Sequence, residues 1–427
     1  MRTPIWLTLI VAVAATALAL AAAALLLNPS GPPLASASIS LETITPNADR
    51  QAEVTRFIYT LRRPATVSIY FTNAAGERFY FRREKPRSAG ENVVDFGGVV
   101  EPYALPGEQF EAEILARVLQ NGAYTWTVEA RDEAGQNNAF SGPLTIQDAD
   151  TALPLLSNLT VAPSLFTPNQ DGLDDRVAFN LDLAKTVPAN NLRLYLIGPD
   201  NTPIVIGESN NTPRKPGEAG THTYDYDGGV EFSEIPPPDG EYTVRAEAED
   251  ALGQKTALTT QLTIQGGGLP QAEIVQGQVD FSSNVVVLGD TLYFTVTVQN
   301  YGLSPIRTTG PFSGHVYDSM SQNYAATGYY QESGAFRIGL MCDTCMNDFP
   351  WRWALGTPET LTTLPDANGR PHLYLMPGQR ATITGGIVLD EIITRRNPQY
   401  FWAGLIHEDV RILNNGADLQ LITIEEP

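Results

Sequence analysis

The stretch Asn121–Gln136 reads NGAYTWTVEARDEAGQ, and Asp239–Gln254 reads DGEYTVRAEAEDALGQ, which is the same pattern 118 positions later. Each stretch alternates apolar and polar residues after an Asn-Gly or Asp-Gly pair. Alternation with a period of two is typical of a strand with one buried face, and such pairs are typical of hairpin turns. The repeat therefore predicts an antiparallel sheet that is formed twice.

The repeat extends beyond this hairpin. Leu144–Gln147 returns as Leu262–Gln265, and Gly97–Val99 returns as Gly228–Val230. A repeat of this length is a whole domain rather than a solenoid unit. We therefore expect two homologous two-sheet sandwiches, at residues 38–150 and 151–268.

The composition supports a chain of short strands. The 427 residues include 36 Gly and 31 Pro, too many for long helices, and the length suggests three domains. The net charge of −21 argues against binding to nucleic acid, whose phosphates attract Lys and Arg.

An apolar segment precedes the domains. Ile5–Leu27 contains no charged residue, and a helix of that length spans a hydrocarbon core of ~30 Å. Residues 1–37 are therefore expected to form a membrane anchor and spacer, with the remainder of the chain outside the cytoplasm. The alternative is a signal peptide cleaved after Ala37, which would leave a secreted protein.

The third region, 269–427, also reads as strands. Thr291–Asn300 alternates like the repeated hairpins and ends at a Tyr-Gly pair, and Arg380–Leu389 follows a Pro-Gly-Gln turn. Between them, roughly residues 319–372 form an aromatic-rich stretch that we interpret as an insertion. The expected fold class is therefore all-β, with three tandem Ig-like sandwiches after one N-terminal helix.

Two family resemblances follow from these motifs. The run FTPNQDGLDD at Phe166–Asp175, followed by a Gly-Gly turn and the second hairpin, resembles FlgD-type bacterial Ig-like domains. The Gly-Asp turn, the strand ending in V-Q-N-Y-G and the later Pro-Gly-Gln turn of the third region resemble the adhesion-related CARDB domain. Both resemblances imply extracytoplasmic structural or interaction modules without a reaction of their own.

One candidate site is the loop PNQDGLDD, where four oxygen-bearing side chains flank a glycine. Ca²⁺ prefers several oxygen ligands from a tight loop, but the same residues also form turns that cap backbone amides. The sequence leaves a calcium site and a purely structural turn open, and it indicates no other cofactor. The residues concerned are Asn169, Asp171, Asp174 and Asp175.

The predicted insertion holds the other candidates. Trp351, Arg352 and Trp353 could stack on and hydrogen-bond to a sugar or peptide, or the rings could pack the insertion onto its own domain. Cys342 and Cys345 are the only cysteines, and in an exported chain they are expected to form a local disulfide, with two free thiols as the alternative.

The remaining polar cluster does not assemble into catalytic machinery. His407, Glu408 and Asp409 are adjacent, yet no hydrolase or metalloprotease motif accompanies them. We therefore expect no enzyme. The sequence favours an envelope spacer, adhesion or assembly module whose partners are other envelope proteins or surface polysaccharide. The alternative is a glycan- or peptide-binding protein that uses the aromatic-rich insertion.

Overall fold

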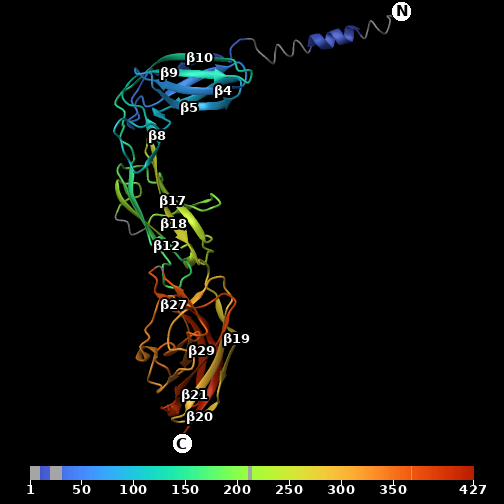
Figure 1. Ribbon diagram of the computed structural model, residues 1–427, viewed down its shortest axis with the longest axis vertical. Coiled ribbons are helices and arrows are strands. Elements are labelled where there is room, and N and C mark those ends of the chain that lie inside the picture. The colour runs from blue at the N-terminus through green and yellow to red at the C-terminus, as the bar shows by residue number, and fades with distance from the viewer. Residues whose placement is uncertain (1–9, 20–30, 210–213, 367) are drawn as a thin grey trace, which may run out of the picture.

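The structure is a computed structural model that describes residues 10–19, 31–209, 214–366 and 368–427. Three β-domains lie end to end in an elongated molecule, with domain 1 at one end and the C-terminus at the other (Figure 1). In the described part of the chain, helix is confined to residues 10–19 and to three short 3₁₀ turns, η1 (Val230–Phe232), η2 (Tyr324–Thr327) and η3 (Thr394–Arg396). The expected all-β class is therefore observed.

Most of the apolar N-terminal segment Ile5–Leu27 lies outside the described residues. Residues 10–19 are helical, and no described helix has both the length and the apolar character needed to cross a membrane. The first strand, β1, begins at Leu34, ahead of the domain boundary expected at residue 38. Because Leu34 is buried and pairs with Leu61, residues 34–37 belong to the first domain rather than to a spacer.

Domain 1 packs a three-stranded sheet, in the order β1-β3-β6, against a five-stranded sheet, in the order β2-β10-β9-β4-β5. Apolar side chains at alternate positions point into one core between the two sheets, as in β3, whose inward positions are all buried. The strands are β1 (Leu34–Ile39), β2 (Thr43–Ile44), β3 (Thr55–Leu61), β4 (Ala65–Thr72), β5 (Arg78–Arg87), β6 (Gly90–Phe96), β9 (Gly122–Arg131) and β10 (Asn137–Ile146).

Domain 2 repeats this topology strand for strand. Its sheets have the orders β11-β13-β16 and β12-β18-β17-β14-β15, which match the two sheets of domain 1. The repeated hairpins of the sequence are β9–β10 and β17–β18, each paired antiparallel along its whole length. The strands are β11 (Leu156–Ala162), β12 (Leu165–Phe166), β13 (Val177–Leu183), β14 (Leu192–Ile197), β15 (Pro203–Ile206), β16 (Gly220–Tyr226), β17 (Gly240–Glu249) and β18 (Lys255–Ile264).

The first two domains share a sheet. The two strands β7 (Val99–Val100) and β8 (Glu113–Val118) leave domain 1, and β8 pairs antiparallel with the start of β18. Ala112 beside β8 even belongs to the core of domain 2. Gln254 is buried at the same joint, where its amide nitrogen donates to the carbonyl oxygens of Asp150 and Ala152 at 3.0 Å each.

Domain 3 is a larger sandwich with a single core. A four-stranded sheet, in the order β19-β21-β28-β23, faces a second sheet in the order β20-β30-β29-β24-β22-β27-β26, to which β25 is added beside β24. The strands are β19 (Ala272–Phe281), β20 (Val285–Val287), β21 (Thr291–Asn300), β22 (Ile306–Thr308), β23 (Val316–Tyr317), β24 (Phe336–Cys342), β25 (Trp351–Ala354), β26 (Thr362–Pro365), β27 (Pro371–Leu375), β28 (Arg380–Val388), β29 (Gln399–His407) and β30 (Arg411–Glu425).

The stretch 319–372, interpreted above as an insertion, is part of this sandwich. Within it, β24 is a central strand that pairs with β29 along its full length. Every residue of β24 except Met341 is buried, so the strand lacks the polar alternation that identifies a half-exposed strand. The stretch is therefore built into the sandwich, and the interpretation that it is an insertion stays a prediction. A strand that is buried on both faces lacks the polar alternation that would reveal it in the sequence.

Candidate functional site at the joint between domains 2 and 3

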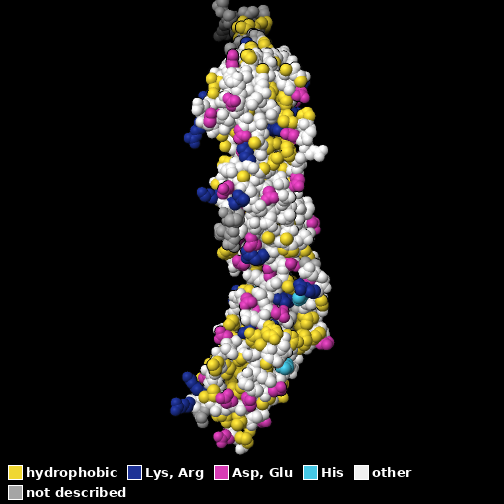
Figure 2. Space-filling view, turned by 90° about the vertical axis from the view of Figure 1, so that its left-hand side faces the viewer, with side chains coloured by type: hydrophobic (Ala, Val, Ile, Leu, Met, Phe, Trp, Pro, Cys, Tyr) yellow, Lys and Arg dark blue, Asp and Glu magenta, His cyan; other side chains and the backbone are white. Residues whose placement is uncertain are grey.

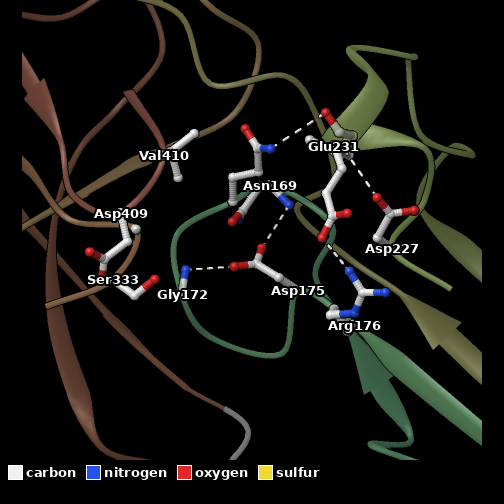
Figure 3. Close-up of a pocket in the computed structure, with 12 residues that line it drawn as sticks. Asn169, Gly172, Asp175, Arg176, Asp227, Glu231, Ser333, Asp409 and Val410 are labelled. Atoms are coloured by element: carbon white, nitrogen blue, oxygen red, sulfur yellow. Dashed lines mark hydrogen bonds and ion pairs between the residues drawn. The ribbon is translucent and has the colours of Figure 1, made fainter. Parts of the chain in front are cut away.

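The loop 168–175 follows β12 and is shaped by its own side chains. Asn169 Oδ1 accepts a hydrogen bond from the Asp171 amide at 3.0 Å, and Asp171 Oδ1 accepts one from the Leu173 amide at 2.9 Å. The Asp175 carboxylate accepts from the amides of Asn169 and Gly172, at 3.1 and 2.5 Å (Figure 3). The contacts of Asn169 and Asp171 are successive Asx turns, and the Asp175 carboxylate closes the loop by accepting from amides that precede it.

The four candidate calcium ligands lie in this loop, but most of their oxygens already accept hydrogen bonds. Asp174 differs, because it is its backbone carbonyl, not its carboxylate, that accepts a hydrogen bond from the Thr167 amide, at 2.9 Å. The residue also lines a recess of about 270 Å³. Within the described ranges, no group of three or more His, Cys, Asp or Glu side chains is placed to hold a metal ion. The turn accounts for the observed contacts, and calcium binding by the loop stays a prediction.

The same loop docks into domain 3, which the sequence did not predict. Arg307 Nε, on β22, donates to the Asp171 carbonyl at 2.6 Å, and the Tyr374 hydroxyl, on β27, donates to Asp171 Oδ2 at 2.8 Å. His407 Nε2, at the end of β29, lies 2.7 Å from the Gln170 carbonyl. Side chains from three strands of domain 3 therefore form hydrogen bonds with two consecutive residues of domain 2.

Two glycines allow this close approach. A Cβ on Gly172 would lie 2.0 Å from the Ser333 carbonyl oxygen, and a Cβ on Gly334 would lie 2.1 Å from the carbonyl carbon of Asp171. Both glycines also have positive φ, at 83° and 79°. Any side chain at either position would push the backbones of the two domains apart.

The burial of the joint shifts its titrating groups. Burial raises the pKa of Asp171, although the Tyr374 hydroxyl acts in the opposite direction. Burial and the neighbouring charge of Asp171 raise the pKa of Asp175 to about 7. Burial lowers the pKa of His407 to about 4, so at neutral pH the ring is uncharged and its Nε2–H is the donor to Gln170.

Beside the loop lies a cavity of about 420 Å³, which opens between the two domains (Figure 3). Arg176 is the only basic residue among the described residues that line it, and it forms ion pairs with Glu231 and Asp225. The acidic residues in its wall come from both domains: Asp175, Asp227 and Glu231 from domain 2, and Asp409 from domain 3. Charged side chains from both domains therefore line the cavity at the joint.

The adjacent Glu408 is structural. It is 2% exposed, and its carboxylate lies 2.6 Å from Arg352 and 3.3 Å from Arg337, both themselves buried. The ring of Tyr324 stacks under the Arg352 guanidinium, at 4.2 Å. His407 faces the joint and Glu408 faces two arginines, so the three neighbouring polar residues of the sequence serve separate contacts.

Trp351 and Trp353 are not available to a ligand, which corrects the interpretation of this pair as a binding platform. Both rings are 0% exposed and fill the core of domain 3. Trp353 Nε1 donates to the His315 carbonyl at 3.0 Å, and its ring meets Phe294 edge-on at 4.6 Å. In a strand, residues two apart share a face, so the W-R-W alternation was the available sign that both rings point inward.

Cys342 and Cys345 are bonded to each other. The sulfurs are 1.96 Å apart, and the Cα separation of 5.1 Å is one that disulfides commonly span. The bridge closes the turn directly after β24, where the Cys345 amide also donates to the Cys342 carbonyl at 3.1 Å. It therefore fixes the end of a central core strand rather than the tip of an exposed loop.

Comparison with known proteins identifies no family. No model of a protein family matches the chain, and no curated protein does. Among solved structures, it is similar to a Ca²⁺-stabilized adhesin with which an Antarctic bacterium binds ice: 12% identity, 93% of this chain and 75% of that one covered, TM-score 0.24. A tetra-tandem repeat from the extending region of a large adhesion protein gives 12% identity, 92% and 74% coverage, and a TM-score of 0.19. A 1.5-MDa bacterial ice-binding adhesin gives 12% identity, 85% and 100% coverage, and a TM-score of 0.18.

Proposed function

We propose that this chain is a non-catalytic spacer of the cell envelope that holds its distal domain at a fixed distance and orientation. The observation that carries this proposal is the joint between domains 2 and 3, where Gln170, Asp171 and Gly172 are in close contact with domain 3 and Asp171 is buried. Flexible tandem domains are joined by exposed linkers with few crossing contacts. Here a buried carboxylate, a buried histidine and two backbone-to-backbone approaches cross the joint instead.

The joint between domains 1 and 2 supports the same role by a different device. A strand pairing crosses it, and Lys185 Nζ binds the carboxylates of Asp150 and Asp250 at 2.8 and 2.7 Å. Along the visible face, acidic and basic side chains are interspersed from end to end (Figure 2). Such a surface keeps an extended rod soluble without directing it to one charged partner.

The finer assignments of the sequence belong to this proposal. We propose that domain 2 is a FlgD-type Ig-like module, that domain 1 is a divergent copy of it, and that domain 3 is CARDB-like. The matching strand orders of domains 1 and 2 support their common origin. In this view the partners are other envelope proteins or surface polysaccharide. Nucleic acid is disfavoured by the net charge of −21.

The placement of the chain outside the cytoplasm rests on its apolar N-terminal segment. We propose that Ile5–Leu27 anchors the chain in the membrane, with all three domains outside. N-terminal sequencing of the native protein tests this directly. Residues ahead of Ala37 are expected to be retained, and a mature terminus at Ser38 would instead mean a secreted protein that has lost the buried Leu34.

Rigidity of the joint can be measured as a distance distribution. Spin labels are placed at two exposed positions, Val205 of domain 2 and Tyr293 of domain 3. Pulsed EPR then measures the distribution of distances between the two labels. The full chain is expected to give a narrow distribution that Gly172→Ala broadens. Gly76→Ala is the matched control, because Gly76 has φ 81° but a Cβ there meets nothing within 4 Å.

A broad distribution in the unmodified chain would contradict the spacer proposal. So would a Gly172→Ala chain that keeps the narrow distribution. The alternative function, ligand binding through Trp351 and Trp353, is not retained, because neither ring reaches the surface.

A further inference from the structure

The two homologous domains differ at one edge. In domain 2, the first residues of β18 pair with β8 of domain 1, with Ala257 opposite Glu113 and Lys255 opposite Ala116. The equivalent strand of domain 1 is β10, which occupies the same place in the same sheet order. Among the described residues, only the last two of β10 pair with a further strand on this side, β2, so its first residues form a sheet edge there.

Burial reports the difference residue by residue. Gln254 and Ala257 in domain 2 are 0% and 3% exposed, whereas their repeats Gln136 and Ala139 are exposed. In domain 2, Gln254 Oε1 also accepts a hydrogen bond from the Val118 amide of the docked strand, at 3.3 Å. The edge of β18 is thus buried by its partner strand β8. Among the described residues, the equivalent edge of β10 in domain 1 has no partner strand.

The backbone of this edge is set up for pairing. The Thr145 and Gln147 amides donate outward to Glu42 and Ile44, so odd-numbered residues of β10 point their N–H groups away from β9. Asn137 and Ala139 therefore present N–H groups at the edge, and no described residue accepts a hydrogen bond from them. In domain 2, Lys255 and Ala257 present the same groups to β8.

The side chains of this edge do not protect it. Natural edge strands usually carry charged residues that prevent pairing with other chains. The outer strand at the other side of the same sheet, β5, does so, since it reads RFYFRREKPR. The exposed half of β10 reads NNAFSGP and carries no charge at all, and proline enters only at Pro143.

We propose that the edge Gln136–Ala139 of domain 1 is a docking site for an extended strand of another β-domain, bound antiparallel as β8 is bound to β18. The partner strand has the chemistry of β8, with an acidic residue opposite Ala139 and an aliphatic run after it. Recognition is by backbone pairing through Asn137 and Ala139. Gln136 takes no part in it, because its Oε1 already accepts a hydrogen bond from Arg63 Nη2 at 2.8 Å. This function goes beyond holding a distance, because it gives the rod an attachment point at its membrane-proximal domain.

Disulfide trapping with a β8 peptide tests the proposal. The probe is the peptide EAEILARVLQ, residues 111–120, with Glu113→Cys, and the target is the full chain carrying Ala139→Cys. In antiparallel strands, directly opposed residues have Cα separations that a disulfide can bridge. The matched control is the full chain with Thr259→Cys, an exposed position of β18 beyond the residues that β8 covers.

In a glutathione redox buffer, the Ala139→Cys chain is expected to capture the peptide severalfold more than the Thr259→Cys chain does. It is also expected to capture a scrambled peptide with the same cysteine severalfold less than the β8 peptide. Equal capture by both chains would overturn the proposal, as would equal capture of the scrambled peptide. Cross-linking of Ala139→Cys chains to one another in place of the peptide would also overturn it, since the occupant would then be a second copy.

Discussion

The Tyr374 hydroxyl donates a hydrogen bond to the Asp171 carboxylate across 2.8 Å, and this bond joins residues 203 positions apart in two different domains. Both groups are buried, at 6% and 4% exposure. A buried carboxylate oxygen that loses its donor cannot form a hydrogen bond with water in its place. The bond therefore makes the stability of the joint depend on one hydroxyl group.

Tyr374→Phe is expected to destabilise the joint by about 1–3 kcal/mol, because the ring still packs while the Asp171 oxygen is left without its donor. Calorimetry of the full chain would record this as a lower melting temperature, together with a broader distance distribution between domains 2 and 3. Tyr400→Phe is the control, since that ring is 42% exposed on β29 and position 400 carries no spin label. Equal effects of the two substitutions would mean that the Tyr374 hydroxyl contributes nothing specific.

The pKa of Asp175, raised to about 7, predicts a pH dependence of stability. Between roughly pH 4 and 7 the folded chain holds a proton that the unfolded chain has released, so this contribution is present below that window and lost as pH rises through it. The lowered pKa of His407, about 4, acts in the opposite direction. Its contribution is lost as pH falls from about 6.5 to 4.

Asp175→Asn is therefore expected to make the melting temperature fall more steeply on acidification from pH 7 to 5 than in the unmodified chain, because the effect of His407 is no longer opposed. Asp174→Asn, which removes the same charge from the same loop, should keep the original slope. Identical slopes in the unmodified chain and in Asp175→Asn would show that Asp175 does not titrate in this range.

Calcium binding by the loop 168–175 has a separate test. A ligand that binds only the folded state raises stability by about 2.7 kcal/mol at a hundred times its dissociation constant. If the loop binds calcium, millimolar Ca²⁺ should raise the melting temperature, Mg²⁺ should do so less, and Asp174→Asn should reduce the rise without removing the hydrogen bonds of Asp171. An unchanged melting temperature would leave the loop as a turn and a joint only.

The disulfide between Cys342 and Cys345 is expected to act locally. Loop-closure entropy is small for a bridge over two intervening residues, so reduction should lower the melting temperature only slightly. The reduced chain should become sensitive to protease after β24, in the turn 343–350, while domains 1 and 2 stay intact. Thiol titration of the denatured, unreduced chain should detect no free thiol, and two thiols would refute the bridge.

The sequence by itself determined the repeated hairpins, the all-β class and the turn chemistry of the loop 168–175. These features depend on local patterns, because alternation along β17 and an Asx turn at Asn169 are encoded within a few neighbouring residues. The repeat also implies that domains 1 and 2 share one strand order, which the structure then supplies. Periodicity fails for β24, since a strand buried on both faces carries no alternation.

Only the tertiary structure decided where these elements meet. Gln136 and Gln254 are the same residue of the repeat, yet one is exposed and the other buried beneath β8. From the sequence, Asp171 is a candidate metal ligand or turn residue. In the structure it is part of the joint, because Tyr374 and Arg307 of another domain form hydrogen bonds with it. Contacts between residues far apart in the chain depend on how whole domains pack, and no local pattern records that packing.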